Sequence, residues 1–106
     1  MIVVIDYGAG NIGSVLNMFK RLGTKVKSSS DPSEIQNAEK LILPGVGSFD
    51  FGMKKLKESN LIDVLNKKVL IDKTPILGIC LGVQLMTKSS EEGEMKGLGW
   101  FDAETV

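Results

Sequence analysis

The chain has 106 residues, a length that fits one domain. Its thirteen basic residues balance thirteen acidic ones, so no overall field favours binding to nucleic acid or to an anionic membrane. One cysteine, Cys80, excludes an internal disulfide, and the opening apolar run, residues 2–5, is too short for a signal peptide or a membrane span. These features predict a cytoplasmic protein.

The first quarter of the chain predicts a strand, a helix and a second strand. Residues 2–5 form a β-branched apolar run typical of a strand buried on both faces. From Asn11 the apolar period becomes that of a helix, which Asn11 caps and Gly23 ends. The apolar stripe of this helix consists of Ile12, Val15, Leu16, Phe19 and Leu22. Residues 24–28 are more polar and predict an edge strand.

The remaining elements continue the alternation. Asp31, Pro32 and Glu34 predict the start of a short helix, with Asp31 as its cap. The later expected elements are a buried strand at 40–43, helices at 50–58 and 60–71, a strand at 74–79, a helix from about residue 80 and a further strand in the tail 98–106. In the helix expected at 60–71, Leu61, Leu65 and Val69 share one face.

Strands that alternate with helices indicate right-handed βαβ units. We therefore expect an α/β fold with an open, doubly wound parallel sheet of the flavodoxin-like type. In such sheets ligands bind at the carboxyl ends of the strands. That rule selects three glycine-rich turns, at residues 6–11, 44–48 and 80–82.

The first turn contains a dinucleotide-binding pattern. Gly8, Gly10 and Gly13 spell G-x-G-x-x-G between a strand and a helix, and Asp31 lies near the place expected for a ribose-binding acid. However, Asp31 already serves as a helix cap, and the Asp6 carboxylate would lie near the pyrophosphate. A single match to this motif is weak evidence for nucleotide binding.

The third turn has the pattern of a nucleophile elbow. Gly78 and Gly82 flank Cys80 at a strand-to-helix turn, where small neighbours leave room for a strained, exposed side chain. The helix N-terminus lowers the pKa of a thiol there, and the N–H of Leu81 can stabilise an oxyanion. The alternative is that Cys80 is a small buried hydrophobic residue.

The middle turn offers a second set of oxyanion donors. Residues 44–47 read Pro-Gly-Val-Gly and follow an adjacent buried strand, so their N–H groups are unencumbered. A simple strand-ending turn is the alternative. Taken together with the elbow, this turn indicates acyl transfer from a carbonyl compound.

Polar residues after the elbow could contact a substrate. Gln84 lies one helical turn beyond Cys80 on the same side, and Glu91 and Glu92 follow the helix. Taken singly, each is more typical of an ordinary solvated surface.

The segments IDYGAGN (5–11), LPGVGSF (43–49) and ILGICLGVQLM with SSEEG and GLGW (76–100) together resemble the class I glutamine amidotransferases. They are most similar to the glutaminase subunits of imidazole glycerol phosphate synthases. The resemblance runs along the whole chain in order.

The resemblance implies a site and a partner. It implies that Cys80 attacks the carboxamide of glutamine and that ammonia passes to a (β/α)₈ cyclase in histidine biosynthesis, without a cofactor or a metal. The residues it implies are Leu81, Val46 and Gly47 for the oxyanion, Gln84 and Glu92 for the substrate, and Tyr7, Gly8, Gly10 and Asn11 near the cyclase interface.

The chain also departs from the family pattern. Its 106 residues contain no histidine, whereas the family places a catalytic histidine and glutamate in a further half of the domain. We expect residues 1–106 to be the N-terminal part of an amidotransferase domain, truncated after about four to five strands. Without a base to deprotonate the thiol, the isolated chain is expected to be inactive. An unpaired apolar strand edge is expected to cause self-association.

Two other functions remain open on sequence alone. The same ammonia-donor chemistry could serve another acceptor, such as one in a surface-sugar pathway. A non-catalytic, flavodoxin-like module that binds a nucleotide or a protein would need no base.

Overall fold

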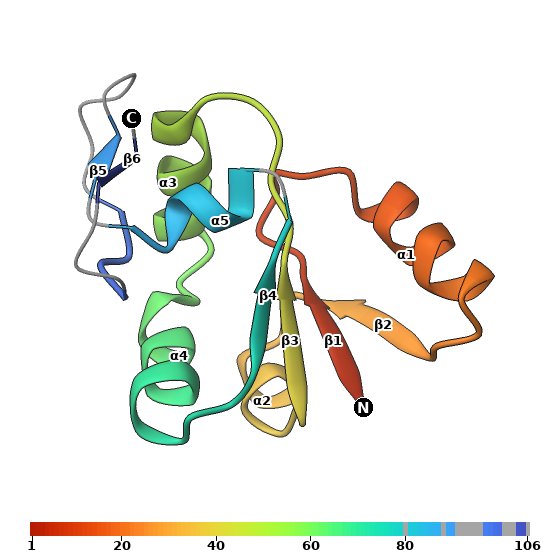
Figure 1. Cartoon of the computed structure of the whole chain (residues 1–106). Coiled ribbons are helices and arrows are strands. Elements are labelled where there is room, and N and C mark those ends of the chain that lie inside the picture. Colours follow the sequence, from red (N-terminus) through yellow and green to blue (C-terminus); the bar gives the residue numbers. More distant parts are fainter. Residues whose placement is uncertain (80, 88, 91–96, 101–103, 106) are drawn as a thin grey trace.

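The computed structural model describes residues 1–79, 81–87, 89–90, 97–100 and 104–105 (Figure 1). The strands are β1 (Ile2–Ile5), β2 (Val26–Ser29), β3 (Lys40–Leu43), β4 (Ile76–Gly78), β5 (Ser89–Ser90) and β6 (Glu104–Thr105). The helices are α1 (Ile12–Arg21), α2 (Pro32–Gln36), α3 (Phe49–Glu58), α4 (Ile62–Asn66), which continues as a π-helical turn (Lys67–Ile71), and α5 (Leu81–Leu85). No helix within the described residues is both long enough and apolar enough to cross a membrane.

The main sheet is parallel and has the strand order β2-β1-β3-β4. The expected α/β fold is therefore confirmed, as is the edge position of the polar second strand. β4 forms the other edge. A strand also occurs in the tail, but β6 pairs with β5 in a separate two-stranded sheet.

Helices cover both faces of the main sheet, but unequally. Figure 1 shows α1 on one side and α3, α4 and α5 on the other. The larger apolar cluster lies on the α3 side and includes Ile5, Leu43 and Phe49, all fully buried. The smaller cluster packs α1 against Val4 and Ile42. The doubly wound arrangement thus has one thick layer of helices and one thin one.

The thin layer leaves β4 uncovered. Val4, Ile42 and Leu77 are neighbours in register on the α1 face of the sheet. Their exposed fractions are 0%, 3% and 54%, because α1 covers β1 and β3 but does not reach β4. One residue of the predicted stripe, Leu22, is also 70% exposed, since it lies beyond α1 as the C-cap residue.

Caps define the helices as the sequence predicts. The Asn11 side chain accepts a hydrogen bond from the Ser14 N–H at the start of α1, and Gly23 follows its end with φ +75°. Asp31 caps α2 through the Ser33 N–H. Glu34, expected to complete that cap, instead binds the β2 side chains Lys27 and Ser29, and the hydrogen bond from Lys27 is the main reason why its pKa is lowered. It thereby ties α2 to the edge strand.

The predicted helix 60–71 carries a buried lysine. Leu61 and Leu65 are fully buried as expected, but the next buried position on this face is Lys68 rather than Val69. The Lys68 ammonium donates to the carbonyl oxygens of Gln36 and Ala38, each at 2.8 Å. These carbonyls lie at the end of α2, where the helix dipole favours a cation. The lysine therefore binds the π-helical turn to α2.

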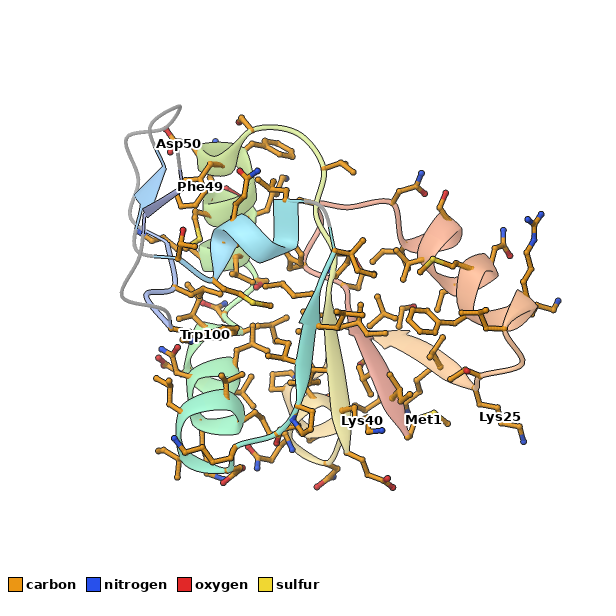
Figure 2. All side chains as sticks on the ribbon, in the orientation of Figure 1. Met1, Lys25, Lys40, Phe49, Asp50 and Trp100 are labelled. Carbon is orange, nitrogen blue, oxygen red and sulfur yellow. The ribbon has the colours of Figure 1, made fainter. Side chains whose placement is uncertain are left out.

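The GLGW segment binds the end of α5. The N–H groups of Leu98, Gly99 and Trp100 donate to the carbonyls of Leu85, Thr87 and Met86, at 2.7, 3.0 and 2.9 Å respectively. The Trp100 indole N–H also donates to the Asn66 side chain at 2.7 Å, so this segment connects α5 to α4. Figure 2 labels Trp100 at this position.

The junction between β4 and α5 is packed tightly on the end of β3. A Cβ atom added to Gly82 would lie 1.8 Å from the carbonyl oxygen of Leu43 and 2.8 Å from its carbonyl carbon. Real Cβ atoms do not approach backbone atoms so closely, so only glycine fits this position without moving β3 or α5. The start of α5 is thereby held against the carboxyl end of β3.

Replacing Lys68 with methionine should lower the free energy of unfolding by about 1–3 kcal/mol, because the Gln36 and Ala38 carbonyls lose their donor. Lys67→Met is the matched control. Lys67 is exposed and makes only a surface ion pair with Asp72, so this change should cost less than about 0.5 kcal/mol. Urea denaturation measures both, and equal effects would contradict the role assigned to Lys68.

Replacing Gly82 with alanine should lower the free energy of unfolding by about 3 kcal/mol or more, since the added methyl group would overlap the Leu43 carbonyl. Gly13→Ala is the control, because a Cβ at Gly13 in α1 meets nothing within 4 Å. Alanine there should stabilise the protein by about 0.5–1 kcal/mol. A tolerated Gly82→Ala change would show that the approach is looser than the structure has it.

Candidate active site

The three glycine-rich turns meet at the end of the main sheet that is formed by the carboxyl ends of its strands. The Tyr7 hydroxyl, from the first turn, donates to the Pro44 carbonyl of the second at 2.5 Å. The Leu81 N–H, from the third, donates to the Gly45 carbonyl at 3.1 Å. Figure 2 labels Met1, Lys25 and Lys40 at the opposite end of the sheet, where its strands begin. The convergence expected from the parallel sheet is thus present.

The proposed nucleophile, Cys80, lies outside the described residues, but the residues on either side of it define a tight turn. The Ile79 N–H donates to the Leu43 carbonyl at 3.0 Å, and the Gly82 N–H donates back to the Ile79 carbonyl at 3.0 Å. β4 ends at Gly78 and α5 begins at Leu81, so the chain passes from strand to helix over a short turn. This strand-turn-helix connection is the local structure that a nucleophile elbow requires.

The expected oxyanion donors do not face one point in this structure. The Leu81 N–H is occupied by the Gly45 carbonyl. The Gly45–Val46 peptide is trans, so its N–H, which belongs to Val46, points away from Leu81. For the two N–H groups to bind one oxygen, this peptide would have to turn over. The exposed Val46 and Gly47, with φ +93° at Gly47, form the outer part of the turn.

The four residues expected near a partner interface differ in exposure. Gly8 and Asn11 are exposed, and Gly10 is half-buried with φ +125°, where a Cβ would lie 3.4 Å from the Pro44 ring. Tyr7 is only 3% exposed, and its side chain points inward to the second turn. Burial raises the pKa of Tyr7 to about 12, so the phenol stays protonated at neutral pH.

The two expected substrate contacts are described unequally. Gln84 is half-buried on α5, one helical turn after the elbow, as its spacing predicts. Glu92 lies outside the described residues. Among the described residues, no hydrogen bond joins Gln84 to the first two turns. The substrate-binding roles of Gln84 and Glu92 therefore stay predictions.

The glycines of the dinucleotide pattern shape the first turn. Gly8 and Gly10 have positive φ values of +89° and +125°, which a turn requires and side chains disfavour. In a dinucleotide-binding fold the third glycine permits close helix–strand packing, but a Cβ on Gly13 would meet nothing within 4 Å. The Asp31 carboxylate binds Ser33 as the cap of α2. The geometry of this turn therefore does not favour a dinucleotide.

Within the part of the chain that the structure describes, two hollows open at this end of the sheet. On the α1 side, an apolar cavity of about 200 Å³ is lined by Asn11, Ser14, Val15, Met18, Pro44, Gly45, Val46 and Ile79. On the α3 side, a more polar hollow of about 430 Å³ is lined by Asp6, Tyr7, Gly8, Ser30, Lys55, Glu58 and Ser59. The first lies directly beside the elbow and the middle turn. Among the described residues, no cluster of side chains is suited to hold a metal ion.

Sequence reasoning missed the contact between Tyr7 and Pro44. A hydroxyl directly after an apolar strand is a weak signal, since a tyrosine there could equally face solvent or a partner. Only the pairing of β1 with β3 brings these two residues together across 37 positions of sequence.

Comparison with known proteins agrees with this geometry. A family model described as glutamine amidotransferase class-I matches residues 3–97. Proteins described as imidazole glycerol phosphate synthase subunit HisH 2, from Methanococcus maripaludis and Pseudomonas aeruginosa, are 60% and 58% identical to this chain over 106 residues. These matches cover 100% of this chain and 52% of each relative, so the chain spans about half the length of the curated relatives it matches.

A solved structure described as a glutamine amidotransferase has a similar fold. Its TM-score is 0.78 at 23% identity, and the match covers 98% of this chain and 55% of that one. At this identity the likeness speaks for the fold alone. The match of the family model to nearly the whole chain, together with the identity to the curated relatives, shows that the chain belongs to the class I glutamine amidotransferase family.

Proposed function

We propose that residues 1–106 form the N-terminal part of a glutaminase domain, in which Cys80 is the nucleophile. The observation that carries this proposal is the strand-turn-helix connection Gly78–Leu81, packed against the Pro44–Gly47 turn. Cys80 directly precedes Leu81, the first residue of α5, in the sequence, and backbone N–H groups at a helix start favour a thiolate. Family membership and the relatives' names support the same chemistry.

The reaction proceeds in two steps. The Cys80 thiolate attacks the carboxamide carbon of glutamine, and the carbonyl oxygen becomes an oxyanion that the N–H groups of Leu81 and of Val46 or Gly47 stabilise. The intermediate collapses to a glutamyl thioester as a proton is delivered to the departing ammonia. Water then hydrolyses the thioester to glutamate and regenerates the thiol. Gln84 and Glu92 hold the amino-acid end of the substrate.

Proton transfer in this scheme needs a base that the 106 residues do not offer, because they include no histidine. We assign the base to polypeptide that corresponds to the unmatched half of the relatives. The released ammonia passes to a (β/α)₈ cyclase that forms imidazole glycerol phosphate. The exposed Gly8 and Asn11 of the first turn contact this partner. The cytoplasmic location stays a prediction.

Labelling of the thiol tests the glutamine site. Diazo-oxo-norleucine, an electrophilic glutamine analogue, should modify Cys80 about tenfold or more faster than iodoacetamide does, because bound analogue is held beside the thiol. Free glutamine should slow this labelling, and Cys80→Ser should abolish it. Labelling at the rate of iodoacetamide would contradict the proposal. Protection against thermal unfolding by nucleotides would instead favour a nucleotide-binding module.

Ammonia release tests the missing base. The chain alone should release no ammonia from glutamine above the Cys80→Ser background. Adding the part of the M. maripaludis relative that this chain does not match should produce turnover. Turnover by the chain alone would overturn the assignment of the base.

We also propose that the free edge of β4 pairs with another polypeptide, which in the isolated chain is a second copy. The edge carries Leu77, 54% exposed, beside the partly buried Ile79 and the apolar cavity lined by Val46 and Met18. An unpaired parallel strand flanked by apolar side chains favours strand addition.

Sedimentation at increasing protein concentration tests the edge. The apparent mass of the isolated chain should rise with concentration, and Leu77→Lys should reduce this rise, because a charge at the edge opposes pairing. Leu22→Lys is the matched control, since Leu22 is 70% exposed at the end of α1, away from β4. A chain that stays monomeric, or equal effects of the two changes, would contradict the proposal.

A further inference from the structure

Tyr7 has a position that neither the fold nor the proposed chemistry accounts for. It lies two residues after the end of β1 at Ile5, is 3% exposed, and its hydroxyl donates to a backbone oxygen of another turn. An apolar residue would fill the same space without the need to satisfy a buried hydroxyl. The presence of the hydroxyl therefore calls for a function at its acceptor, the Pro44 carbonyl.

That carbonyl is the middle one of three in a row, each held by a hydrogen bond. Leu43 accepts from the Ile79 N–H at 3.0 Å, Pro44 from the Tyr7 hydroxyl at 2.5 Å, and Gly45 from the Leu81 N–H at 3.1 Å. The outer two donors are backbone groups of the elbow, which nearly any residue supplies. Only the middle donor depends on a side chain.

The contact lies where all three turns approach one another. A Cβ added to Gly45 would lie 2.9 Å from the Tyr7 hydroxyl oxygen, 2.9 Å from the Leu81 Cβ and 3.0 Å from the Gly82 nitrogen. Tyr7, the middle turn and the elbow thus touch one another around Gly45. A change in the Pro44–Gly45 peptide would move the Gly45 carbonyl that lies on the Leu81 N–H.

We infer that Tyr7 is a positioning residue, whose hydroxyl fixes the Pro44–Gly45 peptide and thereby sets how the oxyanion segment meets the elbow. The inference rests on the proposed glutaminase function for its chemical consequence. The hydroxyl anchors the peptide just before Gly45–Val46, the peptide that carries the Val46 donor. Deprotonation does not release the anchor near neutral pH, since burial raises the pKa of Tyr7 to about 12.

Tyr7→Phe tests the inference in the isolated chain, because it keeps the ring and removes the hydroxyl. Amide hydrogen exchange should become about 5–10-fold faster at Leu81, the factor expected for one hydrogen bond of ordinary net strength. The Ile79 amide, which donates to Leu43, serves as the internal reference and should change less. Ser59→Ala is the matched control, since its hydroxyl also donates to a backbone carbonyl, that of Leu56 at 2.6 Å. This control should leave exchange at Leu81 unchanged.

A chemical readout separates positioning from general loosening. With Tyr7→Phe, the maximal rate of Cys80 labelling by diazo-oxo-norleucine should fall about 5–10-fold at an unchanged half-saturating concentration, whereas labelling by iodoacetamide should stay within about twofold. Equal acceleration of exchange at Ile79 and Leu81 would overturn the inference, as would unchanged labelling by the analogue when the unmodified chain reacts preferentially with it.

Two further outcomes keep the test decisive. If the unmodified chain shows no preference for the analogue, the glutaminase proposal fails, while faster exchange at Leu81 in Tyr7→Phe still supports the anchor because exchange needs no glutamine site. If Tyr7→Phe does not fold, fluorotyrosine can replace Tyr7, the only tyrosine of the chain. Its more acidic phenol is a stronger donor and should slow exchange at Leu81; unchanged or faster exchange would overturn the inference.

Discussion

The close approach of Gly82 to the Leu43 carbonyl is the constraint on which this site depends. A side chain at residue 82 would overlap the end of β3, so glycine lets α5 start directly against the sheet. That approach places the Ile79 and Leu81 N–H groups on the Leu43 and Gly45 carbonyls. It also brings the middle turn beside Leu81. The Gly-x-Cys-x-Gly pattern therefore has a packing reason at its last glycine, in addition to the chemical role proposed for its cysteine.

In these contacts the Leu81 N–H serves the fold, although the proposed chemistry requires the same N–H as an oxyanion donor. The Leu81 N–H, proposed to stabilise an oxyanion, here satisfies the Gly45 carbonyl, and the Val46 N–H points the other way. Glycines at residues 45 and 47 have no side chains to restrict their own torsions, so the backbone on either side of Val46 is less restricted than at other residues. The Tyr7 hydroxyl holds the preceding peptide. In the middle turn, the Pro44–Gly45 peptide is thus held by a hydrogen bond, whereas the Gly45–Val46 peptide that follows is less restricted.

Unequal covering of the sheet explains why this piece of the family fold has an apolar edge. The α3 side has a continuous cluster that includes Phe49, Met53 and Leu56, all essentially inaccessible. On the other side α1 is the one described helix that packs on the sheet, and burial decreases from Val4 to Leu77 across the strands. About half the length of the matched relatives has no counterpart here. The proposal of a partner at β4 follows from this uneven covering, whereas the proposal of an external base follows from the lack of histidine in the 106 residues.

The sequence by itself determined the order of the elements, the parallel sheet and the three turns that meet at its carboxyl edge. Apolar periodicity and caps such as Asn11 and Asp31 are local signals, and local signals suffice for these features. The sequence also identified the family through its turn motifs. Tertiary structure alone decided that Lys68 is buried against the end of α2, that Glu34 binds β2 instead of closing its cap, and that Tyr7 faces Pro44. These contacts join residues far apart in the chain, or join a side chain to one of several possible partners. Which partner is reached depends on strand pairing and on the space left between packed elements. No local sequence pattern specifies either of these.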